Sequence, residues 1–576
     1  MTDARRPVPR RPAAAPRLDR RGFGRGVAHG LAGIGLAATG LAGAGAARGA
    51  PSRRGLVLAA TAGGGPVRAS LPGAGAPTRV TMRPPAPLLL GYAGSRSRAG
   101  LERPRDAAIL HVTSLDGGDE PGTLRWAART DTDNHGRRFD GPAVVVFDVS
   151  GHIELAGDLL FDRPRRWFAG QTAPAAANGS GGIYVHGHRR RLRASHVVVE
   201  HLRFVDGSPV KHDHGAFDIG YAADRDLHDI VVRNCTFLWG VDETFSITPA
   251  FAGREVKRRV DHVSVIDCLF AEPAQLDGKR GYNAMLQRGS HRIEWVRNAG
   301  FGARYRNPAL KEYTSAAITN NLAYDIHYPS VGIFTQADWV GDYPELYPAG
   351  QTLTHVGNVE EAGPSWSSPA TTFVHHYDID TGALRYSGVR QYFADEWIAG
   401  APASYPPRAG HRVLAAPPLW PRRGIMPHED VAAHVRAHVG AWPGARSATE
   451  ARIIATWQRG GPLAHDAVDR RGIADFPDRL IAATTGRPAL PSAPFATAAD
   501  GRTVIEDWLE RRHLAVGGSP DHDLDKRLRF PAGGIVTVAA DGTVTFEPED
   551  MAAGTAGVVE VGRADGGVVT VTCRAD

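Results

Sequence analysis

Three segments, VVVEHLRF (197–204), IVVRNCTF (230–237) and VSVIDCLF (263–270), share one plan. Each is a short β-branched run that reaches a small or polar residue and, three positions later, a phenylalanine; the polar residues His201, Asn234 and Asp267 are 33 residues apart. Related versions follow at Asn298, after 31 residues, and in ITNNLAY (318–324) at Asn321, after 23 more. A constant motif at uneven steps predicts a rigid unit that repeats while its loops vary in length.

Such a unit fits one coil of a right-handed, single-stranded parallel β-helix, which needs a short strand, a tight bend and apolar side chains that stack inward. Asparagine tolerates the left-handed bend, and its amide can bond the equivalent side chain one coil away. A β-sandwich or propeller would need hairpin signals between the runs. Between residues 190 and 330 only Asp206-Gly207 and Asp277-Gly278 are of this kind. The pattern therefore favours the β-helix.

The texture of the chain changes on either side of this region. We expect the β-helix over residues 106–425, preceded by a low-complexity linker or lead-in at 51–105 that lacks a sustained period. Apolar residues recur at helical spacing over 431–439, 448–457 and 504–514, which predicts a helical extension over 426–515. Alternating apolar residues around Asp541-Gly542 and Asp565-Gly566 predict a small β appendage at 516–576.

The first fifty residues combine many arginines with an apolar stretch from Gly26 to Ala47, and contain Asp19-Arg20-Arg21-Gly22-Phe23. This resembles a twin-arginine export signal, so we expect an exported protein, periplasmic or secreted, with the signal removed and no stable membrane insertion afterwards. A retained membrane anchor is the alternative. A net charge of +6 is weak evidence for a nucleic-acid partner. The three cysteines, Cys235, Cys268 and Cys573, lack zinc-site spacing and are predicted to be buried core residues.

Several segments in order along the chain resemble the pectate lyase family of polysaccharide lyases, in particular its exported bacterial branch. They are HVTSLDGGDEPGTLRWA (111–127), VVVFDVSGHIEL (144–155), FAGQTAP (168–174), VVVEHLRF, NCTFLWGVDE (234–243), RYRNPAL (304–310) and VIEDWLERRHL (504–514). The resemblance covers about residues 106–515 and implies a monomeric enzyme that cleaves an acidic uronate polymer, such as pectate, by β-elimination.

The family's chemistry assigns roles to matching residues. β-Elimination removes the proton next to the uronate carboxylate, and positive charge on that carboxylate stabilises the carbanion-like state. The resemblance implies calcium as a cofactor, which suits bridging carboxylates. It makes Arg306, in Arg306-Asn307-Pro308, the catalytic base, and Lys311 a substrate contact. Asp242 and the neighbouring Glu243 are the matching metal ligands.

The chain departs from the family pattern at several positions. Gly215 replaces an aspartate, although Asp213 and Asp218 lie close and are candidate metal ligands; Ser246 replaces another. Asn283 stands where relatives have a lysine, which leaves Lys279 as a candidate substrate contact. Arg233-Asn234 stands where relatives have Asp-His.

Four histidines, His201, His212, His214 and His228, fall around the same coil. Together they could bind a transition metal, although exposed loop histidines are the simpler interpretation. His214 is a candidate for substrate binding or proton transfer.

Two other functions remain open. A glycoside hydrolase on the same scaffold needs a carboxylate pair, for which Asp213 with Asp242 is better placed than the adjacent Asp242 and Glu243. A non-catalytic polysaccharide-binding β-helix is the second alternative, and the replaced aspartates motivate it.

Overall fold

The chain divides into two units, Met1–Ala50 and Pro51–Asp576. The computed structural model describes residues 54–576 of the chain except 62–64, 73–75, 84–87, 91–98, 102–103, 178, 207–214, 253–254, 275–280, 328–330, 336–350, 367–373, 379–388, 406–410, 422–423, 464–482, 498–501, 521–526, 550 and 564–566. The predicted export signal at 1–50 lies outside the described residues.

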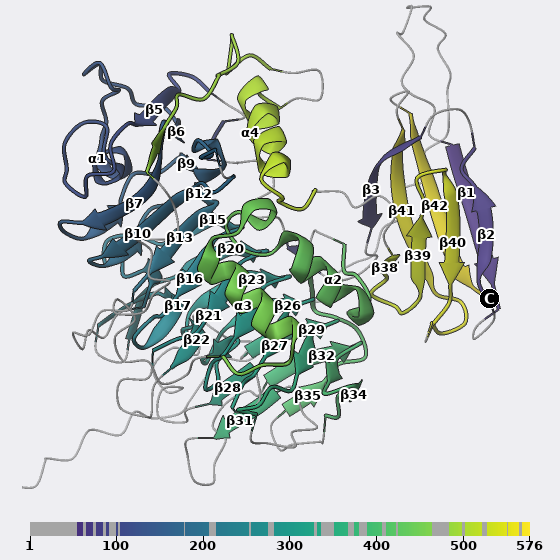
Figure 1. Ribbon diagram of the computed structural model, residues 1–576. Helices are drawn as coiled ribbons and strands as arrows, with labels where there is room; N and C mark the ends of the chain where they lie inside the picture. The colour runs from purple at the N-terminus through teal and green to yellow at the C-terminus, as the bar shows by residue number, and fades with distance from the viewer. Residues whose placement is uncertain are drawn as a thin grey trace, which may run out of the picture. The chain divides into compact units, whose positions relative to one another are not determined.

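Three long sheets form the body of the second unit, and the chain visits them in turn, so that neighbouring strands in each sheet belong to successive coils (Figure 1). The first sheet contains β5 (Ala108–Val112), β6 (Ala143–Phe147), β9 (Arg166–Ala169), β12 (Val197–Glu200), β15 (Leu227–Arg233), β20 (Val260–Ile266), β23 (Ser290–Val296), β26 (Ser315–Thr319), β29 (Gln351–Val356), β32 (Val389–Ala394) and β35 (His411–Val413).

The second sheet contains β37 (Thr484–Thr485), β7 (Val149–Leu155), β10 (Ile183–Gly187), β13 (Leu202–Val205), β16 (Thr236–Leu238), β21 (Leu269–Ala271), β24 (Ala299–Phe301), β27 (Leu322–Tyr324), β30 (Val359–Glu361), β33 (Trp397–Ile398) and β34 (Ala401–Pro402). The third contains β8 (Leu159–Phe161), β11 (Arg190–Leu192), β14 (Phe217–Gly220), β17 (Glu243–Thr248), β22 (Tyr282–Leu286), β25 (Ala309–Leu310), β28 (Val331–Thr335) and β31 (Val374–Asp378). Coil-to-coil pairing is parallel, as between β12 and β15, which confirms the predicted parallel β-helix.

In the three coils that carry the repeat, the bend between the first and second sheets is a single left-handed residue. His201, Asn234 and Asp267 have φ of 57°, 48° and 53°, and the aromatic residue three positions later points into the core. Phe237 stacks on Phe204 and on Phe270, with ring centroids 5.6 and 5.1 Å apart. Each stacked pair adds about 0.5–1.5 kcal/mol beyond simple burial.

The two later versions of the motif are shifted by one residue, which corrects their predicted roles. The left-handed residues are Arg297 and Asn320, whereas Asn298 and Asn321 follow them. Asn298 and Asn321 form an interior ladder with residues of neighbouring coils: the backbone N–H of Cys268 donates to Asn298 Oδ1, that of Asn298 to Asn321 Oδ1, and that of Asn321 to Asn358 Oδ1, each at 2.9 Å.

The shift also moves the aromatic residues Phe301 and Tyr324 out of the interior stack. Both belong to the cluster that packs beneath the helical extension, and the Phe301 ring centroid lies 5.5 Å from that of Trp457. The three cysteines are buried and free, as expected.

Helices α2 (His428–His438), α3 (Ala448–Gln458) and α4 (Val504–Ala515) form the predicted helical extension. A capping box at Ser447 and Glu450 starts α3. Apolar residues of α2 and α3 pack on the second sheet, while those of α4 pack on the first. The remaining short elements are α1 (Leu124–Arg129), η1 (Gly170–Thr172), η3 (Pro443–Ala445), the pair β18 (Ala250–Ala252) and β19 (Glu255–Arg258), and the pair β4 (Leu88–Leu90) and β36 (Leu419–Pro421).

The β appendage is larger than predicted because it recruits strands from the region expected to be a linker. Strands β1 (Arg54–Ala60) and β3 (Pro77–Arg83) join β41 (Ala556–Arg563) and β42 (Val568–Ala575), and β2 (Val67–Ser70) joins β38 (Arg527–Arg529), β39 (Ile535–Val538) and β40 (Thr543–Glu547). Pairing between such distant segments leaves no local period to detect. Among the described residues, no helix has the length and apolarity needed to cross a bilayer.

Candidate functional site

The candidate site lies on the third sheet, where residues from successive coils stand side by side. Glu243 begins β17 and pairs in register with Tyr282, the first residue of β22, and Tyr282 forms a bridge with Tyr305 in the bend before β25. Arg306 follows Tyr305. The stacking of coils therefore brings together side chains that are up to 63 residues apart in sequence.

An ion pair between Arg306 and Glu243 is the centre of this group. The guanidinium of Arg306 contacts Glu243 Oε1 and lies over the Tyr282 ring, 3.8 Å from its centroid, with the Tyr305 centroid 5.1 Å away. The side chains of Arg306 and Glu243 are 13% and 14% exposed. The pair is thus largely shielded from water, with a small part of each side chain exposed.

This environment gives the two partners different proton affinities. Burial raises the pKa of Glu243 to about 7; Arg306 opposes the shift and Asp242 adds to it. Burial acts to lower the pKa of Arg306, but Glu243 and the two tyrosines outweigh it, so the pKa lies above its ordinary value. In this arrangement Arg306 is a permanent cation, and Glu243 is the group able to exchange a proton near neutral pH.

Asp218, a predicted metal ligand, is buried on β14 beside Ser246 of β17. Ser246 Oγ donates to Asp218 Oδ1 at 2.6 Å, and Arg191 lies 3.6 Å from Oδ2. Burial raises the pKa of Asp218, although Ser246 and Arg191 act against the shift. Ser246 therefore serves as a hydrogen-bond donor to Asp218.

Two other departures from the family pattern have steric or packing causes. A Cβ atom at Gly215 would lie 2.2 Å from the carbonyl oxygen of Glu243, so no side chain fits there without movement. Asn283 is buried, and its Nδ2 donates to Asn307 Oδ1 at 2.6 Å. Asn283 thus fixes the bend that carries Arg306.

Lys311 follows directly after β25. Burial lowers its pKa to about 8; Glu312 opposes this, while Arg306 and Arg288 lower the pKa further. The influence of Arg306 places the two cations within electrostatic range of each other. The other predicted contacts and ligands, Lys279, Asp213 and His214, together with His212, lie outside the described residues.

The described carboxylates do not form a ready calcium site. Asp218 is bonded to Ser246 and lies near Arg191, Glu243 contacts Arg306, and among the described residues neither belongs with Asp242 to a group of three or more closely spaced potential ligands. Calcium needs six to eight oxygen ligands. The described residues at this site therefore do not fit a calcium ion.

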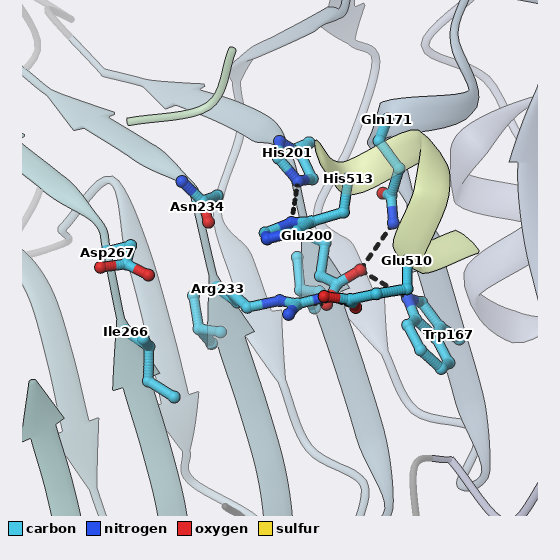
Figure 2. A network of polar contacts seen from close by, with 12 residues as sticks. Trp167, Gln171, Glu200, His201, Arg233, Asn234, Ile266, Asp267, Glu510 and His513 are labelled. Atoms are coloured by element: carbon cyan, nitrogen blue, oxygen red, sulfur yellow. Dashed lines mark hydrogen bonds and ion pairs between the residues drawn. The ribbon is translucent and has the colours of Figure 1, made fainter. Parts of the chain in front are cut away.

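A second polar network, which the sequence did not reveal, lies between the first sheet and α4 (Figure 2). Glu200 accepts hydrogen bonds from Trp167 Nε1, Gln171 Nε2 and Arg233 Nε at 2.9, 2.7 and 2.7 Å. Arg233 also donates to Glu510 of α4 at 3.0 Å. Removing one partner of such a buried pair typically costs about 3–5 kcal/mol, so the network fixes α4 on the β-helix.

This network gives Arg233 a structural role, and the sequence repeat already indicated its partner. Glu200 and Arg233 occupy equivalent positions in VVVEH and VVRN and pair in register. Burial acts to raise the pKa of Glu200, but Arg233 above all outweighs it, so the pKa lies below its ordinary value.

His201 also lies in this contact region between the first sheet and α4, and it does not cluster with His228. Its Nδ1 contacts the carbonyl oxygen of Ala441, and its Nε2 lies 2.7 Å from His513 Nδ1 on α4. The other ring nitrogen of His513 is 2.9 Å from the carbonyl oxygen of Ser519 (Figure 2 shows the two rings). Burial lowers the pKa of His201 to about 4.

Comparisons with known proteins show only a distant structural similarity. No protein-family model matches the chain, and no curated protein matches it. A solved structure of a pectate lyase bound to hexasaccharide is 9% identical, with a TM-score of 0.32, covering 59% of this chain and 92% of that one. A second, from work on substrate specificity and the anti β-elimination mechanism of pectate lyase, is 9% identical, with a TM-score of 0.30 and coverage of 58% and 92%.

A third solved structure, a variant pectate lyase from Xanthomonas campestris, is 11% identical, with a TM-score of 0.31 and coverage of 62% and 99%. The assignment of a parallel β-helix therefore rests on the strand pairing itself.

Proposed function

We propose that this protein cleaves an acidic uronate polymer by β-elimination on its third sheet. The observation that supports the proposal is the contact between Arg306 and Glu243, which joins a permanent cation to a carboxyl group whose pKa is about 7. β-Elimination next to a carboxylate needs a positive charge to neutralise that carboxylate and a base to accept the adjacent proton.

The arrangement suggests how these roles are divided. A uronate carboxylate that binds Arg306 competes with Glu243 for the guanidinium. Because Arg306 is what lowers the Glu243 pKa, its engagement by substrate makes Glu243 a stronger base. The C–H proton next to the bound carboxylate passes to Glu243, its electron pair forms the C=C bond, and the glycosidic C–O bond breaks, leaving an oxygen that takes a proton from water.

Lys311, with its pKa lowered to about 8, is proposed as the contact for a second uronate carboxylate. Arg306 as the base remains the prediction from the family resemblance. The two assignments give different pH profiles. With Glu243 as base, activity rises as the pH increases through about 7 and then levels. With Arg306 as base, activity keeps rising far into the alkaline range.

The test is the appearance of unsaturated uronide, which absorbs in the near ultraviolet, from polygalacturonate and other uronate polymers, with calcium and with a chelator. Glu243→Gln and Arg306→Ala should each lower the rate at least about 100-fold. The matched control is Asp261→Asn, which breaks an ion pair with Arg292 on the first sheet and should leave the rate unchanged.

Reducing ends without unsaturated product would overturn the proposal in favour of the hydrolase. Polymer binding without any cleavage would overturn it in favour of a binding protein. The chelator decides whether calcium takes part.

A further inference from the structure

A compact group of two imidazoles and a carboxylate lies on the first sheet, built by two neighbouring coils. Val197 pairs in register with Ile230, so His196 and Asp229, which precede them, stand side by side, with φ of 58° and 56°. The backbone N–H of His196 donates to the carbonyl of His228 at 3.1 Å, and that of His228 to Ser195 Oγ at 3.1 Å. The backbone positions of all three residues are therefore fixed by the stacking of coils.

The side chains converge on one carboxylate oxygen. His228 Nδ1 lies 2.8 Å and His196 Nδ1 3.6 Å from Asp229 Oδ2, and the two rings meet edge to face with centroids 4.8 Å apart. One ligand atom from each residue lies within 4.8 Å of the others. The side chains of His196, His228 and Asp229 are 31%, 45% and 18% exposed, so the group is accessible to an ion from solvent.

We propose that His196, His228 and Asp229 form a binding site for Zn²⁺ or a similar transition-metal ion. Zinc–nitrogen bonds of about 2.0–2.1 Å in a tetrahedron place neighbouring ligand atoms roughly 3.3 Å apart. The distances of 2.8 and 3.6 Å bracket this value. Two imidazoles and one carboxylate select zinc, nickel, cobalt or copper over calcium and magnesium, which prefer oxygen ligands.

The bound ion would cross-link two coils. His196 belongs to the coil of β12 and the other two ligands to the coil of β15, so the ion bridges neighbouring units of the repeat. An ion that binds only the folded chain stabilises it. The fourth coordination position is left for water. The site is independent of the proposed lyase activity.

A second group, Asp395, His428 and Glu429, has the same ligand types but a different electrostatic setting. Arg529 lies 3.0 Å from Asp395, and Arg527 contacts Glu429, so both carboxylates are held by arginines. By contrast, Arg292, which interacts electrostatically with Asp229, is hydrogen-bonded to a different carboxylate, Asp261. This second group provides the matched control.

The experiment is calorimetric titration of the untagged full chain with Zn²⁺, followed by Co²⁺ substitution and visible absorption. Because the chain has 24 histidines, zinc binding is assigned to this site by comparing variants with the wild type. His196→Ala and His228→Ala should each weaken one equivalent of Zn²⁺ at least about tenfold, because even the loss of a supporting partner costs 10- to 100-fold. They should also abolish the tetrahedral Co²⁺ spectrum and the rise in melting temperature with Zn²⁺. His428→Ala should leave all three unchanged.

Circular dichroism checks that the variants fold, and Asp229→Asn replaces either one that does not. Zinc binding that is absent in the wild type, that persists in both variants, or that is lost in His428→Ala would overturn the proposal.

Discussion

Replacing Asn321 with alanine tests how much the interior ladder holds neighbouring coils together. Asn321 Oδ1 accepts the backbone N–H of Asn298 at 2.9 Å. Its Nδ2 donates to the carbonyl of Trp295 at 2.9 Å and to Asn358 Oδ1 at 2.8 Å. Alanine removes these three contacts and leaves the backbone N–H of Asn298 buried without its acceptor.

The expected cost follows from these contacts. An unsatisfied buried N–H costs about 1–3 kcal/mol, and the loss of the bond to the Trp295 carbonyl adds about 1 kcal/mol, which gives about 2–4 kcal/mol. Cysteine should cost less than alanine, because Cys268 occupies the equivalent position two coils earlier. There the backbone N–H of Cys235 contacts Cys268 Sγ at 3.4 Å.

The assay is amide hydrogen exchange read by mass spectrometry on a peptide that spans β23 and β24. In Asn321→Ala, a loss of about 2–4 kcal/mol in opening free energy speeds exchange there by about 30- to 900-fold. The exchange rate of Asn321→Cys should lie between those of the wild type and Asn321→Ala. A peptide from β6 should keep its exchange rate, since repeats couple mainly to their neighbours. Unchanged exchange in Asn321→Ala, or an equal effect of cysteine, would refute the reasoning.

Two more predictions concern pH and packing. Burial lowers the pKa of His355 from 6.5 to about 3. Below about pH 6.5 the unfolded chain therefore binds a proton that the folded chain excludes. The free energy of unfolding then decreases as the pH drops, by about 2 kcal/mol at about pH 5. His355→Leu should therefore flatten the fall in melting temperature between about pH 7 and 5; parallel curves for the two proteins would contradict this. Gly215→Ala, whose Cβ would meet the Glu243 carbonyl oxygen at 2.2 Å, should cost about 1–3 kcal/mol in a denaturant titration, and an unchanged midpoint would show that the bend adapts.

The sequence predicted the β-helix because the first three motifs repeat with the same spacing between the bend residue and the phenylalanine. His201, Asn234 and Asp267 are the bend residues, and their phenylalanines stack as expected. The prediction slipped by one residue at Asn298 and Asn321, because asparagine suits both the left-handed bend and the ladder position after it. The strands of residues 54–83 were missed, since their partners lie at the other end of the chain.

The candidate site was partly within reach of the sequence. The resemblance singled out Arg306 and Glu243 separately, and stacking of coils shows that they touch. Burial raises the pKa of Glu243, whereas Glu243 and two tyrosines outweigh burial and raise that of Arg306. A sequence motif reports neither environment. His228 was noted, but its partners are His196 and Asp229, because the register of β12 and β15, not closeness in sequence, decides which side chains meet.

The two rings of His201 and His513 stand in a row between the carbonyl oxygens of Ala441 and Ser519. Carbonyl oxygens only accept, so the three contacts need three hydrogens, whereas two neutral imidazoles carry two. All three contacts can therefore be hydrogen bonds at once only when the pair of rings carries one proton more than in its neutral form.

Burial lowers the pKa of His201 to about 4, so its ring is neutral near pH 7 and can donate from only one of its two nitrogens. Arg233, which lies between Glu200 and Glu510, and this pair of rings therefore hold α4 to the first sheet by two different means: one depends on opposite charges, the other on which ring nitrogens carry the hydrogens.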